Sequence, residues 1–117
     1  MAEHNLYGQA GEEAAAAYLA ARGYVVLERN WRTKRGEVDI ICRQGDLLVV
    51  VEVKSRREGE ERPAELLNAA KRRRLRTAAE AYLRAKGLEA EVRFDLVVVT
   101  GERLAVEHFP DAVQIFD

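Results

Sequence analysis

The stretch from Gly36 to Arg57, GEVDIICRQGDLLVVVEVKSRR, constrains the fold more than any other part of the chain. Two apolar runs flank the turn signal Gln44-Gly45, which predicts a β-hairpin. The uninterrupted apolar run Leu47–Val51 is typical of a central strand that is covered on both faces. Charged side chains nevertheless interrupt the runs where a sheet buries its residues, at Glu37, Asp39, Glu52 and Lys54.

The register of this hairpin decides whether the charges meet. A two-residue turn at Gln44-Gly45 sets Asp39 opposite Val50 and Glu37 opposite Glu52, with all four charged side chains on one side of the sheet. Asp39 and Glu52 are then diagonal neighbours, roughly 7–8 Å apart, and can converge on one cation. Ligands that offer only oxygen favour Mg²⁺ or Mn²⁺ over zinc. Spacing alone fits a solvated pair at a strand edge equally well.

The wider chain predicts one α/β domain over residues 1–117 with a mixed sheet. A long connection that contains a helix separates the third and fourth expected strands, which favours their parallel pairing. The expected helices cover residues 5–22, from Asn5 as the N-cap, and 64–86. The expected strands cover residues 24–31, 37–43, 46–54, 91–100 and 103–109.

Composition excludes several classes of protein. The net charge of −1 means that any nucleic-acid surface must come from local clustering of basic residues. The single Cys42 excludes an intramolecular disulfide and a cysteine-based zinc site, and a buried structural thiol is expected there. No apolar run is long enough to span a membrane and no signal-peptide pattern opens the chain, so we expect no membrane association and a cytoplasmic location.

The acidic positions resemble a known signature. Asp39, a gap of twelve residues and then Glu52-Val53-Lys54 resembles the D…(D/E)-x-K pattern of PD-(D/E)XK nucleases. Longer segments resemble the YraN family of uncharacterised bacterial proteins, which is similar to Holliday-junction resolvases, and this likeness covers nearly the whole chain. It rests on GEEAAAAYLAARGYVVLERNWRTKRGEVDII, LLVVVEVKSRR, KRRRL and RFDLVVV. The resemblance implies a restriction-endonuclease-like αβββαβ core with a central mixed sheet flanked by helices.

The resemblance also implies roles for individual residues in a nuclease that depends on Mg²⁺ or Mn²⁺. Asp39, Glu52 and the backbone carbonyl of Val53 would hold the metal. Lys54 would position the attacking water and steady the charge that develops on the phosphate. Glu12 matches an additional acidic residue of resolvase-like proteins, although a solvated helix carboxylate is an equal alternative. DNA, branched DNA included, is the implied substrate, and resolvase-like relatives act as homodimers.

Basic residues bracket these acidic positions. The run KRRRLR, from Lys71 to Arg76, lies in the second expected helix and fits either a phosphate-binding surface or a solvated helix face. The acidic segment EGEER, from Glu58, opposes DNA binding next to it. The residues expected to contact nucleic acid are Arg32, Arg35, Arg56, Arg57, Lys71, Arg72 and Arg74.

Several assignments stay open on the sequence alone. Glu37 fits either a supporting position near the metal or an ion pair with Arg32 or Arg35. Trp31 fits a base-stacking residue or, more commonly, an aromatic at the rim of the core. Arg93 and Asp95 are expected to form a structural pair, and no role follows for His4 or His108. Two other functions compete with a nuclease: a non-catalytic nucleic-acid-binding module, and an adaptor that binds an acidic protein through the Arg-rich helix.

Overall fold

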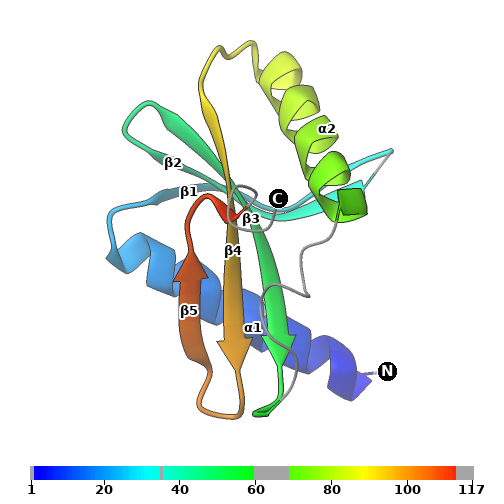
Figure 1. Cartoon of the computed structure of the whole chain (residues 1–117), viewed down its shortest axis with the longest axis vertical. Helices are drawn as coiled ribbons and strands as arrows, with labels where there is room; N and C mark the ends of the chain where they lie inside the picture. The colour runs from blue at the N-terminus through cyan, green and yellow to red at the C-terminus, as the bar shows by residue number, and fades with distance from the viewer. Residues whose placement is uncertain (1, 35, 60–68, 113–117) are drawn as a thin grey trace.

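The computed structural model describes residues 2–34, 36–59 and 69–112. Two helices and five strands follow one another along the chain (Figure 1). In chain order they are α1 (Ala2–Ala21), β1 (Val25–Thr33), β2 (Gly36–Gln44), β3 (Leu47–Arg56), α2 (Ala69–Lys86), β4 (Val92–Thr100) and β5 (Ala105–Phe109).

The strands form one mixed sheet in the order β1-β2-β3-β4-β5. The central pair β3–β4 is parallel, and the other three neighbouring pairs are antiparallel. Parallel pairing follows from α2, which carries the chain from the end of β3 back to the start of β4. The expected α/β class with a mixed sheet is confirmed, and the arrangement is that of a restriction-endonuclease-like core.

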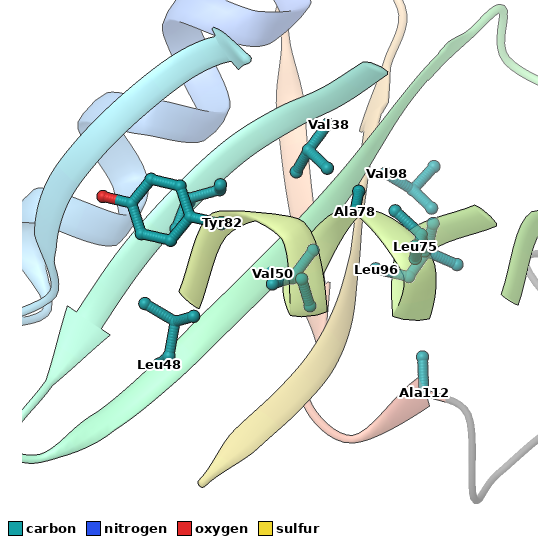
Figure 2. Close-up of a cluster of buried hydrophobic side chains, with 11 residues drawn as sticks. Val38, Leu48, Val50, Leu75, Ala78, Tyr82, Leu96, Val98 and Ala112 are labelled. Carbon is teal, nitrogen blue, oxygen red and sulfur yellow. The ribbon is translucent and has the colours of Figure 1, made fainter. Parts of the chain in front are cut away.

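Each face of the sheet packs against one helix (Figure 1). Leu19 of α1 packs with Val49 and Val51 of β3, whereas Leu75 and Tyr82 of α2 pack against the opposite face. Figure 2 shows this second cluster, in which α2 lies over side chains of β2, β3 and β4. Burial of β3 and β4 on both faces explains their continuous apolar runs. Neither helix in the described ranges is long and apolar enough to cross a lipid bilayer.

The starts of the two expected helices are not where the sequence predicted or lie outside the described residues. Helix α1 begins at Ala2 rather than at an N-cap formed by Asn5. The helix contains Gly11, where an added Cβ would collide with Ser55 of β3, so this glycine lets α1 pack closely on the sheet. The expected start of the second helix at residue 64, and the acidic segment from Glu60 onward, lie outside the described residues.

The expected turn between β2 and β3 is wrong by one residue. Gln44 pairs with Leu47, so the two turn residues are Gly45 and Asp46. Gly45 has a φ of +60° and takes the first central position, where a type II′ turn places glycine. The pairing register therefore shifts by two residues, which changes the opposed pairs but leaves residues 40–44 of β2 on their expected faces.

The sheet is irregular at Asp39. Val38 packs on the α2 face, whereas Ile40, two residues later, packs on the α1 face. Residues two apart on a regular strand share a face, so alternation is interrupted at Asp39. The register places Asn30 of β1 level with Asp39, and Asn30 adopts a left-handed φ of +54°. Both strands are thus distorted at the position of the candidate site.

Candidate active site

Two carboxylates meet where the β2–β3 ladder ends. The last described pair of the ladder is Ile40 with Val51, and continuing that register brings Asp39 level with Glu52. The two carboxyl groups are in hydrogen-bonding contact. The expectation that Asp39 and Glu52 converge is borne out. The expectation that Glu37 faces Glu52 is wrong, because the two-residue shift puts Asp39 in that place.

The backbone of β3 holds the Asp39 carboxylate in place. The N–H of Val53 donates a 2.7 Å hydrogen bond to Asp39 Oδ2. A ladder hydrogen bond is thereby replaced by one from backbone to side chain, which explains why the strands stop pairing here. The metal ligand expected from Val53 is a different atom, its carbonyl oxygen, and that assignment stays a prediction.

The electrostatics of Asp39 are those of a crowded carboxyl group. Burial, followed by the hydrogen bond and the negative charge of Glu52, raises the pKa of Asp39 to about 8. Glu12 of α1 adds a smaller effect in the same direction, whereas the Val53 N–H lowers the pKa. The negative charge of Glu12 therefore reaches Asp39 from α1. A cation would relieve the repulsion within this acidic group.

Glu12 also lines an open groove between α1 and β1. The groove has a volume of about 530 Å³, and its lining includes Gln9, Glu13, Arg29 and Asn30. Arg29 Nη1 donates a 3.1 Å hydrogen bond to Glu13 Oε1, which joins the two walls. Sequence reasoning missed Asn30, because a left-handed backbone within a strand leaves no periodic signal. Asparagine tolerates that conformation better than most residues, which is the one available hint.

Lys54 and Lys71 approach the acidic pair from the α2 face. Lys54 follows Glu52 by two positions on β3 and therefore lies on the same face of the strand. Lys71 has Lys54 and Glu52 as close neighbours. Burial, and then the neighbouring ammonium of Lys54, lowers the pKa of Lys71 to about 8. The structure thus brings Lys71 beside the signature lysine rather than leaving it on an outer helix face.

Other basic residues surround the site to different extents. Arg74 packs its aliphatic stem on Gly36 at the start of β2, so the basic face of α2 reaches the β1–β2 turn. Arg56 is instead held within the protein, where its Nε donates a 3.0 Å hydrogen bond to Thr100 and its Nη2 lies 3.5 Å from Glu107. Arg72 is partly buried, and Arg57 is exposed.

Two further expectations concern the β1–β2 end of the site. Arg32 Nε donates a 3.0 Å hydrogen bond to Glu37 Oε2, which decides between the alternatives for Glu37 in favour of that ion pair. Arg35 lies outside the described residues. Trp31 is an aromatic at the rim of the core, because its ring packs edge-on against Tyr82 at a centroid distance of 5.2 Å.

The donor set fits a hard divalent cation in part. Among the residues that the structure describes, no three His, Cys, Asp or Glu side chains are gathered closely enough to hold a metal ion. Two adjoining carboxylates are nevertheless what Mg²⁺ uses when waters and a substrate phosphate complete its octahedron. Asp39 and Glu52 therefore suit a site that substrate completes, and they do not form a closed structural metal cage.

A second polar cluster lies within the core. Asp95 is fully buried and accepts hydrogen bonds of 2.8 Å from Arg93 Nε and Nη2. His108 Nε2 lies 2.7 Å from Asp95 Oδ2. The N–H of Asp111 donates a 2.9 Å hydrogen bond to Asp95 Oδ1. Burial pushes the pKa of Asp95 upward, but these partners outweigh burial and lower it. The expected Arg93–Asp95 pair is borne out, and sequence reasoning missed His108.

Cys42 is a buried titratable group outside these two clusters. Its side chain packs with Ile40 and Val49 on the α1 face. Burial raises the pKa of the thiol to about 12, and the charge of Asp95 acts in the same direction. A protonated buried thiol is a poor nucleophile, so Cys42 is a core residue, as expected.

Comparison with known proteins gives a consistent family assignment without an activity. Residues 11–99 match the model of "Uncharacterised protein family UPF0102". A UPF0102 protein of Anaeromyxobacter dehalogenans is 51% identical over 90% of this chain and 81% of its own length. A UPF0102 protein of Rhodococcus jostii is 45% identical over 93% of this chain and 98% of its own length. A UPF0102 protein of Phocaeicola vulgatus is 39% identical over 96% of this chain and 95% of its own length.

Proposed function

Because this chain belongs to the UPF0102 (YraN) family, whose name assigns no activity, we propose from its site that it is a metal-dependent nuclease that hydrolyses phosphodiester bonds in DNA. The observation that carries the proposal is the contact between Asp39 and Glu52 at the break in the sheet. Lys54 follows on the same strand face, and Glu12 acts on Asp39 from α1. The resemblance to resolvases supports branched DNA as the substrate.

The crowding of the carboxylates supports this proposal over a purely structural role. A protein that needed only a folded sheet would gain stability from an apolar pair at positions 39 and 52, because adjoining carboxylates repel. Keeping them together has an evident use only where a cation joins them. The hydrogen bond from Val53 to Asp39 holds one carboxylate in a fixed orientation, as a preorganised site requires.

Side-chain chemistry suggests a role for each residue of the site. When bound, Mg²⁺ or Mn²⁺ would polarise the phosphoryl group and lower the pKa of a bound water. Asp39 and Glu52 would hold the ion, with the Val53 carbonyl as a further ligand and Glu12 acting through water. The ammonium of Lys54 would orient the attacking water and balance the negative charge that grows on the phosphate. Arg72 and Arg74 on α2, with Arg32 and Arg57, would contact the DNA backbone.

The first experiment is a calorimetric Mn²⁺ titration of the wild type, Asp39→Asn and Glu37→Gln. Asp39→Asn removes a proposed ligand but keeps an acceptor for the Val53 N–H. Glu37→Gln removes an equal charge from the same strand, where Glu37 pairs with Arg32 instead. We expect binding to be lost only in Asp39→Asn. The same proteins are then assayed with Mn²⁺ on a four-way junction, a flap and a linear duplex. Absence of both binding and cleavage in the folded wild type would refute the proposal.

A non-catalytic DNA-binding module is the second candidate, and the basic face of α2 favours it. Arg74 reaches the β1–β2 turn, so basic residues from two elements lie on one side of the sheet. This alternative predicts binding that weakens steeply with salt and persists in Asp39→Asn. An adaptor that binds an acidic protein predicts no DNA binding even at low salt. A homodimer accompanies the nuclease proposal, because paired cuts in a junction need two sites. A cytoplasmic location is part of the same proposal.

A further inference from the structure

The inner face of α2 ends in a lysine. Leu75, Ala78 and Tyr82 are buried against the sheet and lie along one face of the helix. Lys71 precedes Leu75 by four residues, so it continues the same face by one turn. Figure 2 shows Tyr82 near Leu48 of β3, Ala78 in the middle, and Leu75 near Leu96 and Val98 of β4. Leu96 and Val98 pair with Glu52 and Lys54 of β3, so this end of α2 lies level with those two charged residues.

Strand β3 changes from apolar to charged side chains at the same level. Its α2 face carries Leu48 and Val50 in the core and then continues as Glu52 and Lys54. The apolar interface between helix and sheet thus becomes charged on both sides at once. Lys71 lies close to both Lys54 and Glu52 at this level. Packing of the helix fixes this meeting, because the rotation of α2 is set by its buried residues.

Two neighbouring ammonium groups are an unfavourable arrangement in a folded protein. Like charges at contact distance repel, and Arg74 of the same helix adds to the positive field on Lys71. Ammonium groups carry three N–H donors and no acceptor, so the two lysines cannot hydrogen-bond to each other. Glu52 is a neighbour of both Lys71 and Asp39. An anion with several oxygens, placed between the lysines, would turn the repulsion into attraction.

We propose that Lys54 and Lys71 form a two-ammonium site for the non-bridging oxygens of a phosphate group. Glu52 borders both this site and the carboxylate pair, so a phosphate held by the lysines would lie against the proposed metal ligands. Identification of that phosphate as the scissile one rests on the proposed function. Lys71 is then a catalytic residue that contacts the reacting group, whereas Arg72 and Arg74 contact DNA away from it.

The direct test uses inorganic phosphate as the probe. Affinity is measured by ¹H–¹⁵N NMR titration of the wild type, Lys71→Ala and Arg73→Ala, at constant ionic strength set with chloride. Arg73 is the matched control, because it is a basic, exposed residue two positions along the same helix. We expect Lys71→Ala to weaken phosphate binding by roughly tenfold or more, as for loss of one charge-assisted hydrogen bond, and Arg73→Ala by less than about twofold. Lys71→Met, which keeps the aliphatic stem, replaces Lys71→Ala if the latter does not fold.

The outcomes separate this site from the proposed function. Phosphate binding that is absent in the wild type, unchanged in the Lys71 variants or equally weakened in Arg73→Ala overturns the two-lysine site. Phosphate binding that depends on Lys71, in a protein that neither binds Mn²⁺ nor cleaves DNA, supports the anion site and refutes the nuclease. If DNA is cleaved, we expect Lys71→Ala to lower kcat at least tenfold with KM and Mn²⁺ affinity nearly unchanged, and Lys71→Arg to restore part of kcat.

Discussion

The N–H of Val53 donates its hydrogen bond to the carboxylate of Asp39 rather than to a carbonyl of the neighbouring strand. One contact thereby ends the β2–β3 ladder and orients a carboxylate toward Glu52. The local structure of the sheet and the geometry of the candidate site therefore have a single cause. Replacing Asp39 is expected to affect both, and stability as a function of pH separates the two effects.

Asp39→Asn should flatten the pH dependence of stability in metal-free protein. Asp39 titrates near 3.8 in the unfolded chain and, because of burial and Glu52, near 8 in the folded one. The folded state therefore binds more protons between these values, and the contribution of Asp39 to stability is fully present below pH 3.8 and is lost as pH rises toward 8. Urea unfolding with a chelator at about pH 5 and about pH 7.5 should show a larger decrease for wild type than for Asp39→Asn. Parallel decreases would contradict the raised pKa.

Gly11→Ala should destabilise the protein by about 1–3 kcal/mol, because the added methyl group would overlap Ser55 Oγ and force α1 away from β3. Gly8→Ala is the control in the same helix, since nothing lies within 4 Å of a methyl group there. Gly8→Ala should stabilise by up to about 1 kcal/mol through helix propensity alone. Urea unfolding measures both changes. Addition of Ser55→Ala to Gly11→Ala should recover part of the loss.

Asp95→Ala should cost about 3–5 kcal/mol of unfolding free energy, because the Arg93 guanidinium loses its carboxylate within the core. Glu107→Ala removes the same charge from exposed β5, where its ion pair with Arg56 spans 3.5 Å. Surface pairs of that kind contribute about 0–1 kcal/mol. Equal losses in the two variants, measured by urea unfolding, would show that the buried network contributes no more than a surface pair.

Asn30→Gly should change stability by only a few tenths of a kcal/mol, whereas Asn30→Val should cost about 1–3 kcal/mol. Asn30 adopts a φ of +54°, which glycine enters freely and a β-branched side chain resists. Thermal unfolding of both variants measures the difference. Equal melting temperatures would mean that β1 does not need the left-handed conformation at this level.

The meeting of Asp39 and Glu52 was predictable because of the two-residue periodicity of strands. The expected and observed turns differ by one residue, and the resulting register differs by two, so Asp39 and Glu52 share a face under either pairing. The identity of the opposed pair was not predictable, because it depends on which central position of the turn takes the positive φ of Gly45. Local turn chemistry decided that detail.

Other parts of the site depend on contacts between distant segments. Position 71 could be assigned to a helix, but the face it presents depends on how Leu75 and Tyr82 pack on the sheet. The partner of Asp95 in β5, His108, becomes its neighbour only through the β4–β5 register. Parallel pairing of β3 with β4 was predictable, since a helix-containing connection between two buried strands has few alternatives.

The parallel β3–β4 pair has a consequence for the order in which the site is assembled during folding. Asp39 and Glu52 are brought together by a hairpin with a two-residue turn, a local structure of the kind that forms in about 1–10 μs. Lys71 arrives only when α2 closes the long loop that lets Leu48 pair with Val92. The carboxylate pair and Lys54 can therefore form from local contacts, whereas Lys71 joins them when the topology is complete. A chain that stalls before this closure would hold its carboxylates together without Lys71 beside them.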